Sequence, residues 1–376
     1  MKVCYVLSTS EITGGANRSI LDLLSTLDRK VVDPVVLIKK HGDIENTLKK
    51  MNIPVFLIPF INEVSTENPV LDEIKKLNAI KTTKQVVKFL QDQNVEIVHN
   101  NSLPALAGME AANRLEIPYI CHIREQVWSG LGFHLLNEKK HFKIVKKAAC
   151  ILAISQFVCE EYKDLLIGCP ITVLHDGFNI SLYLNEQKRI FDSNLVNVAI
   201  YGNLDPQKGQ MDAVKAIEIL RERGYENIVL HIIGNQQTRY ADEVKKYVTV
   251  KKIRNIIFSD PIKNIESLKA SRAYMDINLV CSNAEGLGRV TVESMLSGCL
   301  TIGAKAGATP EIIEDGKTGV LYEAGNYIAL AEAINKAIND RSYFSKIAYN
   351  GQKFAMKTYS IISYARKIED IYYSIL

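Results

Sequence analysis

The sequence lacks several features that would place the chain in other protein classes. It has no apolar run of about 18 residues, the length that a membrane-spanning helix needs. Its seven cysteines are odd in number, scattered and never spaced C-x-x-C, so we expect reduced thiols and neither a disulfide framework nor a zinc site. The formal net charge of +4 is small for 376 residues, so we expect no nucleic-acid partner.

The N-terminal apolar stretch is short as well. It is too short for the apolar region of a signal peptide, and no small-residue cleavage site follows it, so we expect a cytoplasmic protein. The hydrophobic content of 47% and the charged content of 23% are typical of a soluble globular protein. The length allows two domains of ordinary size, each with its own core.

Apolar runs of strand length alternate with helix-period segments along the whole chain. Near-continuous apolar strands between helices are typical of a parallel sheet that is covered on both faces. Two such series flank the polar segment 179–194, which is a plausible domain boundary, and they predict two doubly wound domains. The expected strands are residues 3–8, 35–38, 55–58, 97–100, 119–123 and 151–154, then 196–201, 228–233, 256–258, 277–280, 300–303 and 320–321.

The most informative segment is residues 285–293, which has a glutamate at each end. Two glycines keep its first half out of regular structure, and an apolar run then leads into a helix that Gly298 is placed to end. Glu285 is therefore expected in a loop and Glu293 in the first turns of a helix. A helix N-terminus suits a phosphate, and a nearby carboxylate can accept hydrogen bonds from a ribose diol. The segment predicts a site for a nucleotide diphosphate and the group attached to it.

Together with the run GATPEIIEDGKTG at residues 307–319, this segment resembles the E-x7-E motif of retaining glycosyltransferases of family 4. The resemblance implies the GT-B fold, in which two doubly wound Rossmann-like α/β domains face each other across a cleft. Residues 1–180 would bind the acceptor and residues 181–358 the nucleotide sugar. Residues 359–376 would form a C-terminal helix that crosses back to the first domain.

The resemblance also implies an activity. We expect a retaining, metal-independent transferase of the hexosyltransferase type that moves a sugar from a nucleotide-sugar donor to a saccharide or lipid-linked saccharide acceptor, in bacterial surface polysaccharide synthesis. No cofactor is expected, and a UDP-sugar is the favoured donor. The sequence has no Asp-x-Asp triplet, the metal-chelating device of the other large glycosyltransferase fold. Basic groups would then stabilise the departing diphosphate.

The motif residues take their roles from this resemblance. Glu285 would hold the hydroxyl groups of the donor sugar, and Glu293 the ribose diol. Lys208 matches the lysine of the family's G-R-L-x-x-x-K-G pattern, whereas Asn203 stands where that pattern has its arginine and cannot neutralise charge. Arg289 is expected to supply part of the missing charge. The donor-binding set is Gly15, Asn203, Lys208, Pro261, Ile262, Glu285, Gly286, Leu287, Gly288, Arg289 and Glu293.

Three members of this set lie in turns that contain glycine or proline. Gly15 follows Gly14 between the first strand and a helical pattern, where backbone N–H groups can approach an anion; a simple strand-to-helix turn is the alternative. Pro261 and Ile262 follow the strand at 256–258, where the family holds the nucleobase. A plain surface turn is the alternative there.

Polar residues at strand ends in the first half form a second set of candidates. His122 ends the strand at 119–123, and the resemblance places it near the reacting face of the donor sugar; a hydrogen-bonded structural histidine is the alternative. With Glu285 and Lys208 it completes the catalytic candidates. Asn101 touches a substrate or caps the helix after Pro104. Trp128 contacts an acceptor or anchors its loop. The acceptor-side candidates are Gly14, Asn101, Arg124 and Trp128.

Five lysines gather around Phe142 in the segment from Lys139 to Lys147. The segment either docks on the inner face of an anionic cell membrane, where a lipid-linked acceptor would wait, or is a solvated helix face. Two other functions stay open. Asn203 is the one feature that points to a weakly active or non-catalytic partner subunit, and a nucleotide-sugar epimerase can use the same fold.

Overall fold

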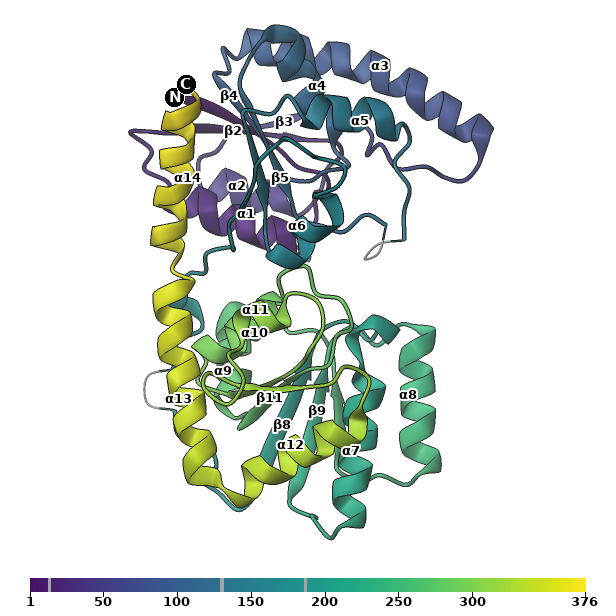
Figure 1. Ribbon diagram of the computed structural model, residues 1–376, viewed down its shortest axis with the longest axis vertical. Helices are drawn as coiled ribbons and strands as arrows, with labels where there is room; N and C mark the ends of the chain where they lie inside the picture. Colours follow the sequence, from purple (N-terminus) through teal and green to yellow (C-terminus); the bar gives the residue numbers. More distant parts are fainter. Residues whose placement is uncertain (13–14, 129–131, 186–187) are drawn as a thin grey trace. The chain divides into compact units, whose positions relative to one another are not determined.

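The computed structural model describes residues 1–12, 15–128, 132–185 and 188–376. The chain divides into two compact units, here called the first and the second unit. The first comprises Met1–Phe178 and Ile361–Leu376, and the second Asn179–Ser360. Each unit is built on one parallel sheet with helices packed around it (Figure 1). The prediction of two parallel-sheet α/β domains is confirmed.

The sheet of the first unit has seven strands in the order β3-β2-β1-β4-β5-β6-β7. Its central strands β1, β4 and β5 are mostly apolar and almost completely buried, as is typical of strands covered on both faces, and their buried polar residues are His99, Asn100 and His122. The last strand, β7, is missing from the strands expected from the sequence because the polar residue Thr172 interrupts its run of three residues at the sheet edge. The strands are β1 (Lys2–Val6), β2 (Asp33–Ile38), β3 (Val55–Leu57), β4 (Ile97–Asn100), β5 (Tyr119–Ile123), β6 (Cys150–Ala153) and β7 (Ile171–Val173).

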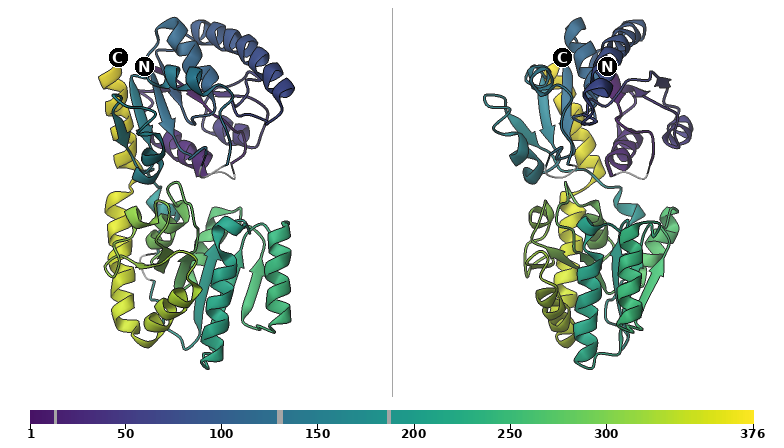
Figure 2. Two further views of the ribbon diagram at one scale, coloured as in Figure 1. Left: turned by 45° about the vertical axis from the view of Figure 1, so that its right-hand side comes forward. Right: turned by 90° about the vertical axis from the view of Figure 1, so that its right-hand side faces the viewer.

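The helices of the first unit include the C-terminal helix of the chain. This helix, α14, packs against α1, and its apolar residues Ile368 and Tyr372 are fully buried in the core of that unit. The two chain ends lie near each other there (Figures 1 and 2). The helices are α1 (Gly15–Thr26), α2 (Ile44–Lys50), α3 (Pro69–Asp92), α4 (Leu106–Leu115), α5 (Glu138–Val145), α6 (Gln156–Tyr162) and α14 (Ile361–Ile375).

The second unit has a six-stranded sheet in the order β10-β9-β8-β11-β12-β13, which is the strand order of a Rossmann fold. Its strands are β8 (Val196–Tyr201), β9 (Ile228–Ile233), β10 (Ile256–Ser259), β11 (Ile277–Val280), β12 (Leu300–Ala304) and β13 (Val320–Tyr322). Its helices are η1 (Ile180–Leu182), η2 (Pro206–Lys208), α7 (Gln210–Glu222), α8 (Arg239–Val250), α9 (Ile265–Ala273), α10 (Arg289–Leu296), α11 (Thr309–Ile312), α12 (Tyr327–Asn339) and α13 (Arg341–Thr358).

The strand order of each sheet reverses beside its first strand. This happens between β1 and β4 in the first unit and between β8 and β11 in the second. In open α/β sheets, ligands bind beyond the carboxyl ends of the strands at such a reversal. A ligand-binding site in the second unit is therefore expected at the loops after β8 and β11. Separately, none of the helices that the structure describes is both long and apolar enough to cross a membrane.

Candidate functional site

Lys208 and Glu285 meet at the strand reversal of the second unit. Lys208 ends η2 after β8, and Glu285 lies in the loop after β11. The Lys208 Nζ atom is 2.5 Å from Glu285 Oε1, and Ser282 Oγ donates to the same oxygen at 2.7 Å. Both charged side chains keep access to solvent, with 35% of Lys208 and 17% of Glu285 exposed. The pair is an accessible charged site that the fold assembles from two loops.

Two glycines allow these loops to approach other backbone segments. Gly307 has a φ of +57°, and a Cβ atom there would lie 2.4 Å from the amide nitrogen of Glu285. The Ala308 amide donates to the Glu285 carbonyl at 2.9 Å. Gly209, at the end of η2, has a φ of +69°, and a Cβ atom there would lie 2.3 Å from the carbonyl oxygen of Cys281. The positions of Lys208 and Glu285 therefore depend on residues without side chains.

The remaining residues of the motif lead into the N-terminus of α10. Gly288 is the N-cap residue, with a φ of +83°, and it has no side chain to cover the first amides of the helix. Leu287 and Gly288 are buried, whereas Gly286 and Arg289 are partly exposed. Helix amides at such an end and the positive end of the helix dipole favour an anion. The helix ends at Leu296, and Gly298 follows with a φ of +73°, as expected for a glycine after a helix C-terminus.

Glu293 lies on the buried side of α10. Its Oε2 atom accepts from Arg272 Nη2 at 2.8 Å, and its Oε1 atom is 3.7 Å from Arg289 Nε. Arg272, which the sequence analysis missed, lies in α9 and stacks its guanidinium over the Tyr201 ring at 4.4 Å from the centroid. A lone arginine in a helical pattern gives no local signal of this pairing. The expected contact of Glu293 with a ribose stays a prediction.

The other donor-side candidates are spread along the edge of the second sheet. Asn203 follows β8 with an exposed side chain, while its carbonyl accepts from the buried Gln210 side chain at 3.0 Å. Pro261 is exposed and Ile262 partly exposed in the loop after β10. The neighbouring β9 is followed by Gly234, where a Cβ atom would lie 1.8 Å from the Gly202 carbonyl oxygen. These loops are closely packed, and the nucleobase contact of Pro261 and Ile262 stays a prediction.

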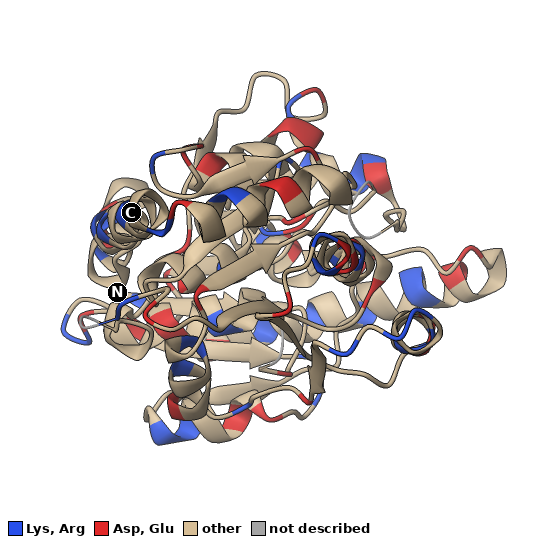
Figure 3. Cartoon of the chain, turned by 90° about the horizontal axis from the view of Figure 1, so that it is seen from below, with Lys and Arg blue, Asp and Glu red and all other residues tan. Residues whose placement is uncertain are grey.

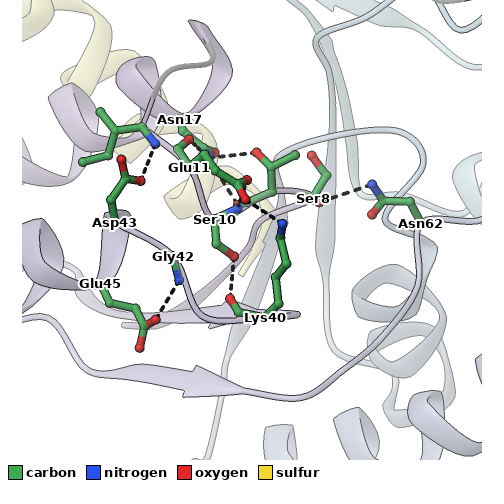
Figure 4. Close-up of polar contacts among 11 residues, drawn as sticks. Ser8, Ser10, Glu11, Asn17, Lys40, Gly42, Asp43, Glu45 and Asn62 are labelled. Atoms are coloured by element: carbon green, nitrogen blue, oxygen red, sulfur yellow. Dashed lines mark hydrogen bonds and ion pairs between the residues drawn. The ribbon is translucent and has the colours of Figure 1, made fainter. Parts of the chain in front are cut away.

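In the first unit, a network of polar contacts holds residues 9–12, which follow β1 (Figure 4). Asn17 Nδ2 donates to the carbonyls of Thr9 and Glu11 at 3.2 and 2.8 Å. Glu11 forms an ion pair with Lys40 at 2.6 Å, and the Ile12 amide donates to Asp43 at 2.8 Å.

Gly15, the first residue of α1, follows this network and is exposed. Gly14 lies outside the described residues. The structure thus places Gly15 at an accessible helix N-terminus, as an anion-binding glycine requires, and its contact with a donor phosphate stays a prediction.

His122 is completely buried in a chain of hydrogen-bonding side chains. Its Nδ1 atom is 3.1 Å from His99 Nε2, and His99 Nδ1 is 2.7 Å from the hydroxyl of Tyr372 in α14. The Tyr372 hydroxyl donates to Tyr5 at 2.8 Å. Burial, helped by the charge of Arg124, keeps the pKa of His122 well below its ordinary value, so the ring is neutral. These contacts match the structural alternative, and a catalytic role for His122 stays a prediction.

Arg124 and Asn101 lie in a second buried cluster of the first unit. Arg124 Nη1 donates to both carboxylate oxygens of Asp176, at 2.7 and 3.0 Å, and its Nε donates to Asn101 at 2.5 Å. Asn101 also donates to the Ala16 carbonyl at 3.5 Å, next to the start of α1. The N-cap of α4 is Ala105, so the interpretation of Asn101 as the cap of that helix is wrong. Its side chain instead orients Arg124.

Trp128 stacks on the aromatic residues of two helices. Its ring is 6.0 Å from that of Phe142 in α5 and 5.6 Å from that of Tyr162 in α6. Its amide donates to Glu161 at 3.2 Å. These are the contacts of a loop anchor, and contact with an acceptor stays a prediction. They also bury Phe142, so the apolar side of the lysine-rich segment faces the protein interior.

The chain is similar to known proteins over nearly its whole length. The family model described as Glycosyltransferase Family 4 matches residues 13–182, and the model described as Glycosyl transferases group 1 matches residues 185–354. The capsular polysaccharide biosynthesis glycosyltransferase CapM of Staphylococcus aureus is 24% identical over 89% of this chain and 93% of its own length.

One further relative is named by its acceptor. It is the GalNAc-alpha-(1->4)-GalNAc-alpha-(1->3)-diNAcBac-PP-undecaprenol alpha-1,4-N-acetyl-D-galactosaminyltransferase of Campylobacter jejuni, which is 22% identical over 94% of this chain and 93% of its own. Among solved structures, Anabaena HepE in complex with UDP superposes over 100% of both chains, with a TM-score of 0.83 and 23% identity. The fold is therefore shared with this nucleotide-binding structure.

Proposed function

Because the chain belongs to glycosyltransferase family 4, we propose that it moves a sugar from a nucleotide-sugar donor to a saccharide acceptor, with retention of the anomeric configuration. The observation that carries this proposal is the accessible Lys208–Glu285 pair beside the N-terminus of α10. A cation and a helix N-terminus suit a diphosphate, and a carboxylate suits sugar hydroxyls. The loops after β8 and β11 thus bring groups that suit a diphosphate close to a carboxylate that suits a sugar.

The donor diphosphate would lie at the start of α10. Lys208 has three N–H donors, so it can bond a phosphate oxygen and keep Glu285 as a partner. Arg289, the first residue of α10, would add a second positive charge. Glu285 would accept hydrogen bonds from the donor sugar, and Asn203 would donate one to the diphosphate. Neutralisation of the diphosphate would thus rest on Lys208, Arg289 and the helix dipole.

The reaction breaks the bond between the anomeric carbon and the diphosphate oxygen, and it forms a bond from that carbon to an acceptor hydroxyl. The bonding electrons leave with the diphosphate, and the acceptor proton passes to a phosphate oxygen on the same face of the sugar. Negative charge then grows on the diphosphate, where Lys208 and the α10 amides would stabilise it. Fixed positive groups that meet developing charge lower the barrier without reorganising.

The proposed nucleotide is UDP, and the proposed acceptor is a saccharide or lipid-linked saccharide of bacterial surface polysaccharide synthesis. UDP is supported by the HepE complexes, which contain UDP, UDP and glucose, or UDP-glucose. The acceptor class is supported by the names of CapM and of the Campylobacter jejuni transferase. We propose no metal and no cofactor, and a location at the cytoplasmic face of the membrane.

The first test is thermal unfolding in the presence of UDP, GDP, ADP, dTDP and CMP. A nucleotide at about 100 times its dissociation constant stabilises the fold by about 2.7 kcal/mol. We expect UDP to raise the midpoint, and Lys208→Ala to weaken this effect. Lys246→Ala, at an exposed site of α8, is the matched control and should respond like the wild type.

A measurement of enzymatic turnover completes the test. We expect release of UDP from a UDP-sugar to depend on a saccharide acceptor, and the product to keep the anomeric configuration of the donor by NMR. A folded protein that no nucleotide stabilises would instead favour the non-catalytic partner subunit to which Asn203 points. An epimerised nucleotide sugar formed without acceptor would favour the epimerase.

A further inference from the structure

The sheet of the second unit ends on one side at β10, whose outer edge pairs with no other strand of the described residues. β10 has four residues, whereas the other edge strands of the two sheets, β3, β7 and β13, have three each. An open strand edge presents unpaired N–H and C=O groups, which can pair with a strand of another chain. Very short edge strands limit such pairing, so β10 is the described edge that is best able to form it.

The backbone groups of β10 alternate between its two sides. The carbonyls of Asn255 and Ser259 accept from two amides of the β9 segment, at 2.8 and 3.0 Å, so they point toward β9. Neighbouring residues of a strand direct their backbone groups to opposite sides, and the groups of Ile256 and Phe258 therefore point away from β9. These two residues offer two N–H and two C=O groups at the outer edge.

The side chains along this edge are arranged symmetrically about Ile257. Ile257 is 47% exposed, while its neighbours Ile256 and Phe258 pack against the core of the second unit. Arg254 lies three residues before Ile257 and Asp260 three residues after it, and both are exposed. Neither of these charged residues has an ion-pair partner among the described residues. An exposed apolar residue is thus flanked at equal distances in the sequence by opposite charges.

This pattern is self-complementary when two copies of β10 lie antiparallel with Ile257 opposite Ile257. Ile256 of each copy then faces Phe258 of the other, and each such pair can form two hydrogen bonds because its backbone groups point outward. Arg254 of each copy faces Asp260 of the other, where opposite charges stabilise a strand pair. A shift by one residue would oppose outward and inward backbone groups, and a shift by two would separate the charges. Backbone and side chains thus favour the same register.

We propose that the chain forms a symmetric dimer in which two β10 strands join the sheets of two second units into one. The contact is isologous, because the same surface of each copy meets itself about a two-fold axis. A second copy fits this edge better than a partner of opposite net charge, since basic and acidic residues are interspersed over the chain (Figure 3) and the edge carries one charge of each sign. Strand pairing alone buries little area, so we expect a dissociation constant on the order of 10 µM. The inference does not depend on the donor site.

The test is sedimentation velocity of the full chain between about 1 µM and about 200 µM, without any nucleotide. We expect the wild type to change from monomer to dimer over this range. Arg254→Asp and Asp260→Arg each place like charges opposite each other at both ends of the contact, so each should weaken the dimer at least about tenfold. The double variant Arg254→Asp/Asp260→Arg restores opposite charges and should dimerise like the wild type. A mixture of the two single variants should form a heterodimer, because both positions are acidic in one variant and basic in the other.

A variant at the centre of the contact and two control variants complete the set. Ile257→Lys sets two like charges opposite each other and should also weaken the dimer at least about tenfold. The controls lie in the first unit: Asp164→Arg reverses an exposed carboxylate, and Ile167→Lys alters an apolar residue that is 75% exposed. Both controls should dimerise like the wild type.

Three results would overturn the proposal. The first is a wild type that stays monomeric at the highest concentration. The second is dimerisation of the single charge variants as strong as that of the controls, since another surface would then form the dimer. The third is a double variant that is folded by circular dichroism but does not recover the dimer, since Arg254 and Asp260 would then not face each other across the contact.

Discussion

Arg272 and Glu293 form an ion pair that is almost completely removed from solvent. Arg272 Nη2 donates to Glu293 Oε2 at 2.8 Å, and the two side chains are only 1% and 4% exposed. The pair links α9 to α10, so the second glutamate of the motif serves the fold of the second unit. A buried pair need not stabilise a protein relative to apolar residues, but removing one partner leaves an uncompensated charge.

We therefore expect Glu293→Ala to lower the free energy of unfolding by about 3–5 kcal/mol in the absence of any ligand. Urea denaturation of the ligand-free protein measures this. Glu332→Ala is the control, because Glu332 pairs with Arg223 at the surface and its loss should cost less than about 1 kcal/mol. If Glu293→Ala were as stable as the wild type and only bound nucleotide more weakly, Glu293 would be a ligand-binding carboxylate instead.

Gly307→Ala should disturb Glu285. A Cβ atom at this position would meet the Glu285 amide nitrogen at 2.4 Å, and backbone atoms cannot rotate away as a side chain does. Gly325 provides the matched control, since it has a similar φ of +74° and a Cβ atom there would meet none of the described atoms within 4 Å. Both alanine variants carry the strain of a positive φ. The difference between their stabilities therefore reports the clash with the Glu285 amide nitrogen.

We expect Gly307→Ala to destabilise the protein by about 1–3 kcal/mol more than Gly325→Ala. It should also reduce turnover with the nucleotide sugar, while Gly325→Ala keeps the wild-type rate. Urea denaturation and UDP release measure the two effects. Equal stability and equal turnover of the two variants would mean that the loop relaxes without moving Glu285.

Tyr372→Phe tests how α14 is held in the first unit. The Tyr372 hydroxyl bonds to Tyr5 and lies 2.7 Å from His99, and all three side chains are fully buried. Losing the hydroxyl leaves buried polar groups without their partner, which costs about 1–3 kcal/mol. Tyr373→Phe is the control, because the neighbouring Tyr373 is 60% exposed and its change should stay within about 0.5 kcal/mol. Chemical denaturation measures the stability of both variants. Equal stabilities of Tyr372→Phe and Tyr373→Phe would show that the buried Tyr372 hydroxyl does not stabilise the fold.

Acidification should destabilise the first unit because its histidines are buried in the neutral form. Burial lowers the pKa of His99 to about 3 and that of His141 to about 4. In the unfolded chain a histidine binds a proton below a pKa of about 6.5. The stability that each neutral ring contributes is thus complete above that value, and it is lost as the pH falls toward the folded pKa. Between pH 7 and pH 5 this amounts to about 2 kcal/mol for each histidine.

Urea denaturation at pH 7 and pH 5 measures this loss. His141→Gln should reduce it, since glutamine can still donate toward the Leu103 carbonyl that His141 Nε2 contacts at 2.8 Å, but does not titrate. A wild type that is equally stable at both pH values would contradict the burial of the neutral rings.

Local patterns in the sequence determined much of the protein. Runs that are mostly apolar, such as those at 228–233 and 277–280, became β9 and β11 with the expected bounds, because a parallel strand covered on both faces is predominantly apolar. The glycines at 286 and 288 placed a loop before α10, since a positive φ at Gly288 excludes a helix there. Among the described strands only β7 was not expected, because the polar residue Thr172 interrupts its short apolar run.

The tertiary structure decided which of these residues meet. Glu293 faces Arg272, 21 residues away in the chain, and Arg124 faces Asp176, 52 residues away. His122 became one link in a buried chain that ends on α14, at Tyr372. A glutamate or a histidine looks the same in the sequence whether its side chain faces a substrate or a buried arginine. Its environment follows from how elements distant in sequence pack, and packing is a property of the whole chain.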